Sequence, residues 1–237
     1  MKLRLMTCAM VASAALFAAN ETDSMTYGIL AVSDNASSNT VVGVPWVNVG
    51  DGNVTISNLI STAGLTDGDG VYLYGEDGVW SGYVLSSGIW EPTTTVGTNT
   101  VVAAPDADGK TVARGTGLII QRADKNATIY LCGRYTNETI TTTITANSLT
   151  LIANPTTSAK TIGDGIGTVG DEIRVPQNGG GLLTYEKRSD GWGREVVTIE
   201  RKGGRDKKIR TWTLGCELAP GMGAWYKCGE TGTSITW

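Results

Sequence analysis

The chain has 237 residues, a formal net charge of −4 and no histidine. The missing imidazole excludes Ser-His-Asp and Cys-His catalysis and the usual histidine metal sites, because each of these needs the ring as base or ligand. The length allows one large domain or two domains of about 100 residues each, and 32 glycines in a Thr- and Val-rich body favour an all-β fold.

The N-terminal segment differs in kind from the rest of the chain. Two basic residues precede an uncharged run from Leu5 to Ala19, which is typical of a secretory signal and is too short for a membrane-spanning helix. We expect residues 1–20 to be this signal and the mature protein to reach the periplasm, the cell surface or the medium. A lipoprotein signal at Cys8 is disfavoured, because Cys8 lies near the start of the apolar run. No later segment approaches the ~20 apolar residues of a transmembrane helix.

One stretch of the chain occurs twice. Residues Gly68–Trp90 recur as Gly170–Trp192, 102 positions later (170 − 68 and 192 − 90), and both copies read as an acidic turn, a strand, a Gly-rich turn, a strand, a second turn and a Trp. Self-similarity at a fixed offset indicates a duplicated unit. We therefore predict two tandem duplicated β modules, sandwich-like or partly closed barrels, at residues 21–136 and 137–237.

Short strands joined by turns of Gly, Asp, Asn and Pro are predicted for both modules. In module one, besides the repeated stretch, we expect strands and one hairpin turn at Tyr27–Val32, Thr40–Val44, Leu118–Arg122, Ala127–Cys132 and Asp106–Lys110. In module two, we expect strands at Glu138–Thr145, Leu149–Ile152, Val196–Arg201, Lys208–Leu214, Gly223–Cys228 and Ser234–Trp237. The last two strands of each module are expected to pair as a hairpin, now at an offset of 106 (223 − 117).

A single short helix is predicted in module one. Apolar residues recur at helical spacing at Ile56, Leu59, Ile60 and Ala63. Ser57 is expected to cap its start and Gly64 its end. At two turns it would need the neighbouring sheet to persist.

Four runs of module two carry a resemblance. They are Leu149–Ile162 (LTLIANPTTSAKTI), Gly170–Val175 (GDEIRV), Gly191–Glu195 (GWGRE) and Leu218–Lys227 (LAPGMGAWYK). The set resembles uncharacterised exported β-rich proteins of Gram-negative bacteria with repeated Asn-Pro, Gly-Asp, Gly-Trp and Pro-Gly-x-Gly-aromatic motifs. Module one matches more loosely, since it lacks the Asn-Pro pair and the last Pro. The resemblance implies export and a cell-surface setting, and it implies no activity.

Acidic residues are the remaining candidates for catalysis or metal binding. Neighbouring carboxylates could serve a glycosidase, and they occur at Glu76 with Asp77, Asp67 with Asp69, and Asp171 with Glu172. The runs DGDG (67–70) and DADG (106–109) space oxygen ligands as calcium loops do, but neither continues into the distal Glu of such a loop. Turn chemistry explains these residues better, so we predict no enzyme activity, no cofactor and no metal site.

Tryptophans and cysteines each admit two interpretations. Seven tryptophans could stack on sugar rings, but Trp90 and Trp192 recur at the same place in both copies and are therefore expected to anchor the two cores. Three cysteines remain after the signal, and an exported chain favours one disulfide. Cys216 with Cys228 is the preferred pair, and three buried thiols that include Cys132 are the alternative.

Charge is separated along the sequence. Residues 21–109 contain eleven acids and no Lys or Arg, whereas residues 110–237 contain seventeen bases and twelve acids. Six bases crowd one predicted hairpin and form a candidate contact for an anionic partner: Arg201, Lys202, Arg205, Lys207, Lys208 and Arg210. Such a separation favours head-to-tail association of identical subunits, or binding of an acidic surface polysaccharide. A nucleic-acid partner is disfavoured, because the exported chain is net negative.

These features together predict an exported, non-enzymatic structural or cell-surface assembly protein that associates with itself through opposite charges on its modules. The first alternative is a carbohydrate- or ligand-binding β module. The second is an outer-membrane β-barrel, suggested by the aromatic C-terminal strand, although the predicted strands are shorter than a bilayer requires.

Overall fold

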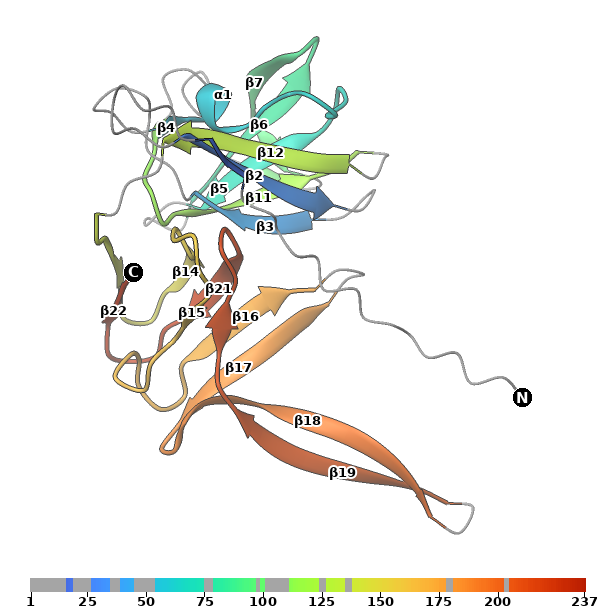
Figure 1. Ribbon diagram of the computed structural model, residues 1–237, viewed down its shortest axis with the longest axis vertical. Helices are drawn as coiled ribbons and strands as arrows, with labels where there is room; N and C mark the ends of the chain where they lie inside the picture. Colours follow the sequence, from blue (N-terminus) through green and yellow to red (C-terminus); the bar gives the residue numbers. More distant parts are fainter. Residues whose placement is uncertain are drawn as a thin grey trace.

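The computed structural model describes residues 16–18, 27–34, 39–44, 54–74, 79–96, 99–100, 111–123, 127–134, 138–177, 181–202 and 205–237. These residues form the predicted all-β, sandwich-like fold with one short helix (Figure 1). The first half runs to Arg134 and the second half starts at Glu138, and every described sheet takes its strands from one half only. Most of the predicted signal, Trp46, the Asp106–Lys110 turn and the predicted boundary at residues 136 and 137 lie outside the described residues.

The first half is built on a five-stranded antiparallel sheet. Its strands, in spatial order, are β3 (Asn39–Gly43), β11 (Gly117–Gln121), β5 (Gly70–Tyr74), β6 (Trp80–Ser86) and β7 (Ile89–Thr93). Smaller sheets complete this half with β1 (Leu16–Ala18), β2 (Tyr27–Asp34) and β12 (Ala127–Arg134), with β4 (Val54–Thr55) and β10 (Thr111–Val112), and with β8 (Thr95–Val96) and β9 (Asn99–Thr100).

The second half is built on a six-stranded antiparallel sheet. In spatial order its strands are β14 (Leu149–Ala153), β21 (Gly223–Lys227), β16 (Glu172–Pro176), β17 (Leu182–Arg188), β18 (Gly191–Lys202) and β19 (Arg205–Leu214). Two small sheets accompany it, formed by β13 (Thr141–Ile144) with β22 (Thr233–Thr236), and by β15 (Lys160–Thr161) with β20 (Glu217–Leu218).

The two halves have the same strand order and the same register in the repeated stretch. The order β3-β11-β5-β6-β7 corresponds to β14-β21-β16-β17-β18, and the small sheets β2-β12 and β4-β10 correspond to β13-β22 and β15-β20. Leu85 pairs with Trp90 as Lys187 pairs with Trp192. Both tryptophans are buried, at 4% and 1% exposure, so the prediction that they anchor the cores is confirmed.

Each half has its own hydrophobic core. In the first half the core lies between the five-stranded sheet and the small sheets, since it joins Val71 and Tyr83 to Ile129 and Leu131 of β12. In the second half the core joins Ile173, Trp192 and Tyr226 to Ile235 of β22 in the same way. Alternation of buried residues is clear in β16, whereas β5 and β14 carry runs of buried residues, and each core is enclosed between sheets as in a β-sandwich.

The predicted closing hairpins are wrong in both halves. β11 pairs with β3 and β5, whereas β12 pairs with β2; likewise β21 pairs with β14 and β16, whereas β22 pairs with β13. Consecutive strands therefore lie in different sheets. The sequence pattern of two apolar strands around a polar turn is the same for both arrangements, so it could not distinguish them.

The predicted helix is present but shorter, and its predicted caps are wrong. α1 spans Ile56–Leu59, and Thr55, not Ser57, accepts the capping hydrogen bond, from Asn58 N at 3.4 Å. Ile60 is already extended and forms a bridge with Leu131 of β12. Pairing with β12 therefore overrides the helical spacing, as expected for a segment too short to be stable as an isolated helix.

The two halves meet through equivalent residues that make equivalent contacts. Gly43 N donates to Gly221 O at 2.7 Å, and Ala153 N donates to Gly115 O at 3.1 Å. Gly43 and Ala153 hold the same place in β3 and β14, because they pair with Gly117 and with its counterpart at the start of β21. A reciprocal pattern of this kind is that of a two-fold interface, here within one chain.

Candidate functional site

The repeated Gly-Asp motif places one buried aspartate in each half. Asp69, with no exposed surface, accepts hydrogen bonds from Thr66 N at 2.7 Å and Ala123 N at 2.8 Å, and its Oδ2 lies 2.8 Å from Nη1 of Arg122. Arg122 is equally buried. These contacts tie the turn before β5 to the end of β11, so Asp69 is a structural residue. The exposed Asp67 beside it does not share this environment.

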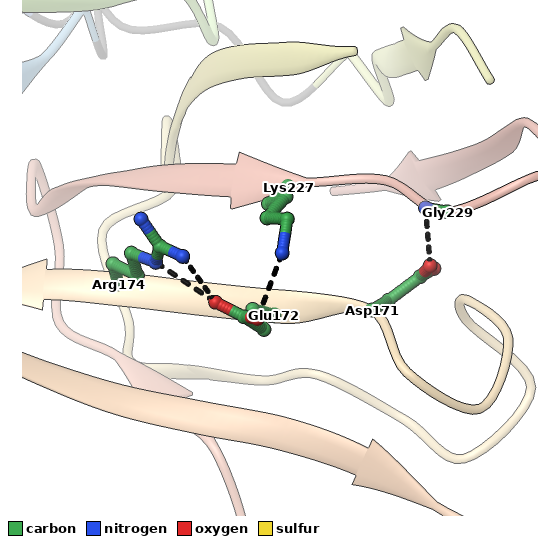
Figure 2. Close-up of polar contacts among 5 residues, drawn as sticks. All are labelled: Asp171, Glu172, Arg174, Lys227 and Gly229. Carbon is green, nitrogen blue, oxygen red and sulfur yellow. Dashed lines mark hydrogen bonds and ion pairs between the residues drawn. The ribbon is translucent and has the colours of Figure 1, made fainter. Parts of the chain in front are cut away.

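Asp171 holds the equivalent place in the second half, with two equivalent backbone donors and a third partner that differs. It accepts hydrogen bonds from Thr168 N at 2.9 Å, from Gly229 N at 2.8 Å (Figure 2) and from the Tyr226 hydroxyl at 2.7 Å. Burial and this hydrogen bond raise the pKa of Tyr226. Asp171 therefore needs no cation beside it, whereas Asp69 has Arg122.

Glu172 faces away from Asp171 and forms a small ion-pair network (Figure 2). Arg174 donates to its Oε2 from Nε at 2.9 Å, and Lys227 donates to its Oε1 from Nζ at 3.0 Å. Burial acts to raise the pKa of Glu172, but Arg174 and Lys227 outweigh it and hold that pKa below its ordinary value. Asp171 and Glu172 are thus committed to separate partners on two sides of the strand and do not form a catalytic pair. The third candidate pair, Glu76 with Asp77, lies outside the described residues.

This network predicts a pH dependence. Since the pKa of Glu172 is lowered below 4.5 on folding, its contribution to stability is complete above that pH and is lost as the pH falls through the folded-state pKa. We expect Glu172→Gln to lower the free energy of unfolding at neutral pH by about 1 kcal/mol or less, because the pairs are partly exposed, and to have a diminishing effect below pH 4.5. Urea denaturation of both proteins across pH 3–7 measures this; a constant difference contradicts it.

β18 and β19 confirm the predicted hairpin and form a long ribbon, here called the arm (residues 191–214), which projects from the second half (Figure 1). Only its first three residues, Gly191–Gly193, pair with β17. From Arg194 outward both edges of the ribbon are unpaired within the described residues. The offset between the halves grows from 102 at Trp90 and Trp192 to 106 at Val112 and Leu218 (218 − 112), so the second half has four additional residues in the segment that contains the arm.

One face of the arm combines exposed apolar and basic side chains. Val197 and Ile199 are 49% and 63% exposed and lie directly opposite Arg210 and Lys208. Of the six predicted contact residues, the structure places Arg201, Lys207, Lys208 and Arg210 exposed on the arm. The register brings Lys202 opposite Arg205 at its outer end, and nothing is described of these two side chains.

Ion pairs on the arm are loose and solvated. Arg210 lies 3.3 Å from Glu195, and Arg201 lies 3.9 Å from Asp206, with all four side chains at least 45% exposed. Pairs of this kind contribute about 0–1 kcal/mol. They leave the arm net basic, because its ten charged residues are seven bases and three acids.

A stacked tryptophan fixes the base of the arm. Trp212 lies so close to Gly193 that a Cβ there would come within 2.8 Å of the indole. The guanidinium of Arg188 lies 3.6 Å from the centre of the same ring and is hydrogen-bonded to Glu186 at 3.0 Å. Sequence reasoning missed this arrangement, for which the Gly-Trp-Gly run at 191–193 was the available signal.

The predicted disulfide is not present. Cys132, Cys216 and Cys228 are free thiols. Cys216 and Cys228 are buried in the second core, and Cys228 Sγ donates to Thr231 O at 3.2 Å. Burial raises the pKa of Cys216 to about 12. The two behave as small core residues, which is the alternative interpretation of their sequence context.

An aromatic cluster and a pocket lie where the halves meet. Tyr74 and Trp80 of the first half contact Trp225 of the second, with ring centres 5.0 to 5.6 Å apart. Tyr74 also lines a pocket of about 490 Å³, here called the junction pocket, between β13, β14 and the 113–116 turn. The sequence did not lead us to predict the cluster or the pocket. The available signal was that Tyr74 and Trp80 are replaced by Pro176 and Leu182 in the second copy of the repeat.

Comparison of the chain with protein-family models, with curated proteins and with solved structures gives no match. The resemblance to exported β proteins therefore stays a prediction. Within the described part of the chain, no helix has the length and apolar character of a membrane span. The same residues contain no group of three or more acidic or cysteine side chains placed to hold a metal ion.

Proposed function

We propose that the protein is an exported, non-enzymatic assembly protein whose copies associate through the arm. The observation that carries the proposal is the arm itself: a ribbon of ten residue pairs that, among the described strands, pairs with the body only through Gly191–Gly193. The acids that suggested chemistry, Asp69, Asp171 and Glu172, are occupied by structural contacts. A surface that meets another molecule is therefore better supported than an active site.

A ribbon of this kind gains stability from a partner. An isolated two-stranded hairpin is only marginally stable in water, and its unpaired edges are templates for further strands. Val197 and Ile199 add apolar surface that nothing in the described chain covers. Contact with another molecule would bury this surface.

Charge argues for a head-to-tail arrangement of copies. If two β19 strands paired with each other, the bases of one strand would oppose those of the other, which is destabilising. Residues 21–109 instead contain eleven acids and no Lys or Arg, and the described Asp67 and Glu91 of this stretch are exposed. An arm that contacts the acidic half of the next copy gives a heterologous interface, which propagates into a chain or array unless it closes into a ring.

Light scattering of the mature protein over a range of concentration and salt tests this proposal. Association between opposite charges should weaken as salt rises. Lys208→Glu, on the exposed face of the arm, should weaken association about tenfold at low salt. Lys160→Glu on β15 is the matched control and should leave association unchanged. A monomer under all conditions, or equal effects of both substitutions, would refute the proposal.

A further inference from the structure

The junction pocket is built from both halves of the chain. Its floor is the turn 113–116 of the first half, and its walls are β13 and β14 of the second half. Thr116 forms a bridge with Ile152, and Ala153 N donates to Gly115 O, so hydrogen bonds fix the floor against one wall. A volume of about 490 Å³ lies within the ~300–1,000 Å³ of small-molecule sites. The pocket is thus formed in advance of any ligand.

Hydroxyl groups dominate its lining. Six threonines, a serine and an asparagine are among the residues that line it: Thr116, Thr141, Thr142, Thr143, Thr145, Thr150, Ser148 and Asn147. Among the described residues that line the pocket there is no carboxylate, and the guanidinium of Arg114 donates to the carbonyls of Glu138 and Pro155. Hydroxyls both donate and accept hydrogen bonds. Such a lining matches a ligand that is itself rich in hydroxyls, and it requires no charged group on that ligand, because Arg114 donates to carbonyls of the chain.

An aromatic ring completes the pocket. Tyr74 lines it and is held in place by Trp80 and Trp225, whose rings meet it at 59° and 75°. A fixed aromatic side chain offers apolar surface at little cost in conformational entropy, and the C–H faces of a sugar ring pack against such a surface. We infer that the junction pocket binds a neutral saccharide. This inference is independent of the arm and of self-association.

Intrinsic fluorescence gives a direct test, because Trp80 and Trp225 contact Tyr74. The full mature chain is titrated with tetrasaccharides of glucose, mannose, galactose and N-acetylglucosamine, and the affinity is confirmed by calorimetry. At least one of these should give saturable binding. Thr143→Val and Asn147→Gly remove one polar side chain each; Gly suits position 147 because Asn147 has φ +55°. Each should weaken binding about tenfold, the loss of a hydrogen bond or two.

Thr198→Val, at an exposed threonine of the arm, is the matched control and should leave the affinity unchanged. Far-ultraviolet circular dichroism and the midpoint of thermal unfolding check that the variants fold. Failure of all four tetrasaccharides to bind would overturn the inference. So would binding that persists unchanged in Thr143→Val and Asn147→Gly, since the ligand would then lie elsewhere, or a preference for the corresponding uronic acids.

Discussion

Arg122→Met should destabilise the protein by about 3–5 kcal/mol, the cost of leaving a buried charge without its partner. Arg122 and Asp69 have no exposed side-chain surface and lie 2.8 Å apart. The substitution keeps much of the side-chain volume and removes the cation, so the carboxylate of Asp69 keeps its hydrogen bonds from Thr66 and Ala123 but loses its charged partner. Guanidinium chloride denaturation, with the free energy extrapolated to water, measures the loss.

Two further variants test whether the loss of stability comes from the unpaired buried charge of Asp69. Arg201→Met removes an arginine that is 73% exposed and should change the free energy of unfolding by about 0.5 kcal/mol or less. Asp69→Asn combined with Arg122→Met removes both charges and should recover part of the loss, because neither charge is then buried alone. If Arg122→Met costs no more than Arg201→Met, the buried pair does not stabilise the fold.

The structure was predicted best in the repeated stretch, where local turn and strand residues determine the fold. Turn residues and alternating apolar residues from Gly68 to Trp90 and from Gly170 to Trp192 specify strand, turn and strand without reference to the rest of the chain. The structure has the same register in both copies and buries both tryptophans. The arm was predicted for the same reason, since two β-rich runs flank a Gly-Gly turn.

Features that depend on distant contacts could not be predicted. Apolar patterns show that β11 and β12 are strands, but not that they belong to different sheets. The helical spacing after Ile56 is real, yet a bridge to Leu131 ends the helix. From the sequence, Asp69 was interpreted as a turn residue. Its ion pair could not be predicted, because its partner Arg122 is 53 residues away (122 − 69). The pocket and the aromatic cluster exist only where the two halves meet.

The repeat in the sequence corresponds to equivalent contacts where the two halves meet. Each half contributes one strand and one turn to the interface, and the contacts are equivalent. Val42 of the first half forms a bridge with Met222 of the second half, and Ile152 of the second half forms the equivalent bridge with Thr116 of the first half. Gly117 and Gly223 lie against the opposite half, where a Cβ on Gly117 would come within 2.6 Å of Leu151. Close approach of the two backbones therefore explains glycine at these places.

Gly43→Ala should destabilise the junction by about 1–3 kcal/mol through overpacking, because the added Cβ would overlap the Cβ of Ala153. Gly43 and Ala153 hold equivalent places in β3 and β14. Adding Ala153→Gly to Gly43→Ala should therefore restore most of the lost stability, because the interface again holds one methyl group at this point, now contributed by β3 instead of β14. Ala153→Gly alone removes that methyl and should cost less than Gly43→Ala.

Denaturation of the four proteins as a double-mutant cycle yields the coupling between the two positions. A coupling above about 1 kcal/mol is expected for atoms in direct contact, and the double variant should be close to the wild type. Additive effects would mean that β3 and β14 do not approach each other there, and the two-fold arrangement of the halves would then be wrong. Because the junction pocket takes its floor from one half and its walls from the other, Gly43→Ala should also weaken any saccharide binding, and Ala153→Gly in the same chain should recover it.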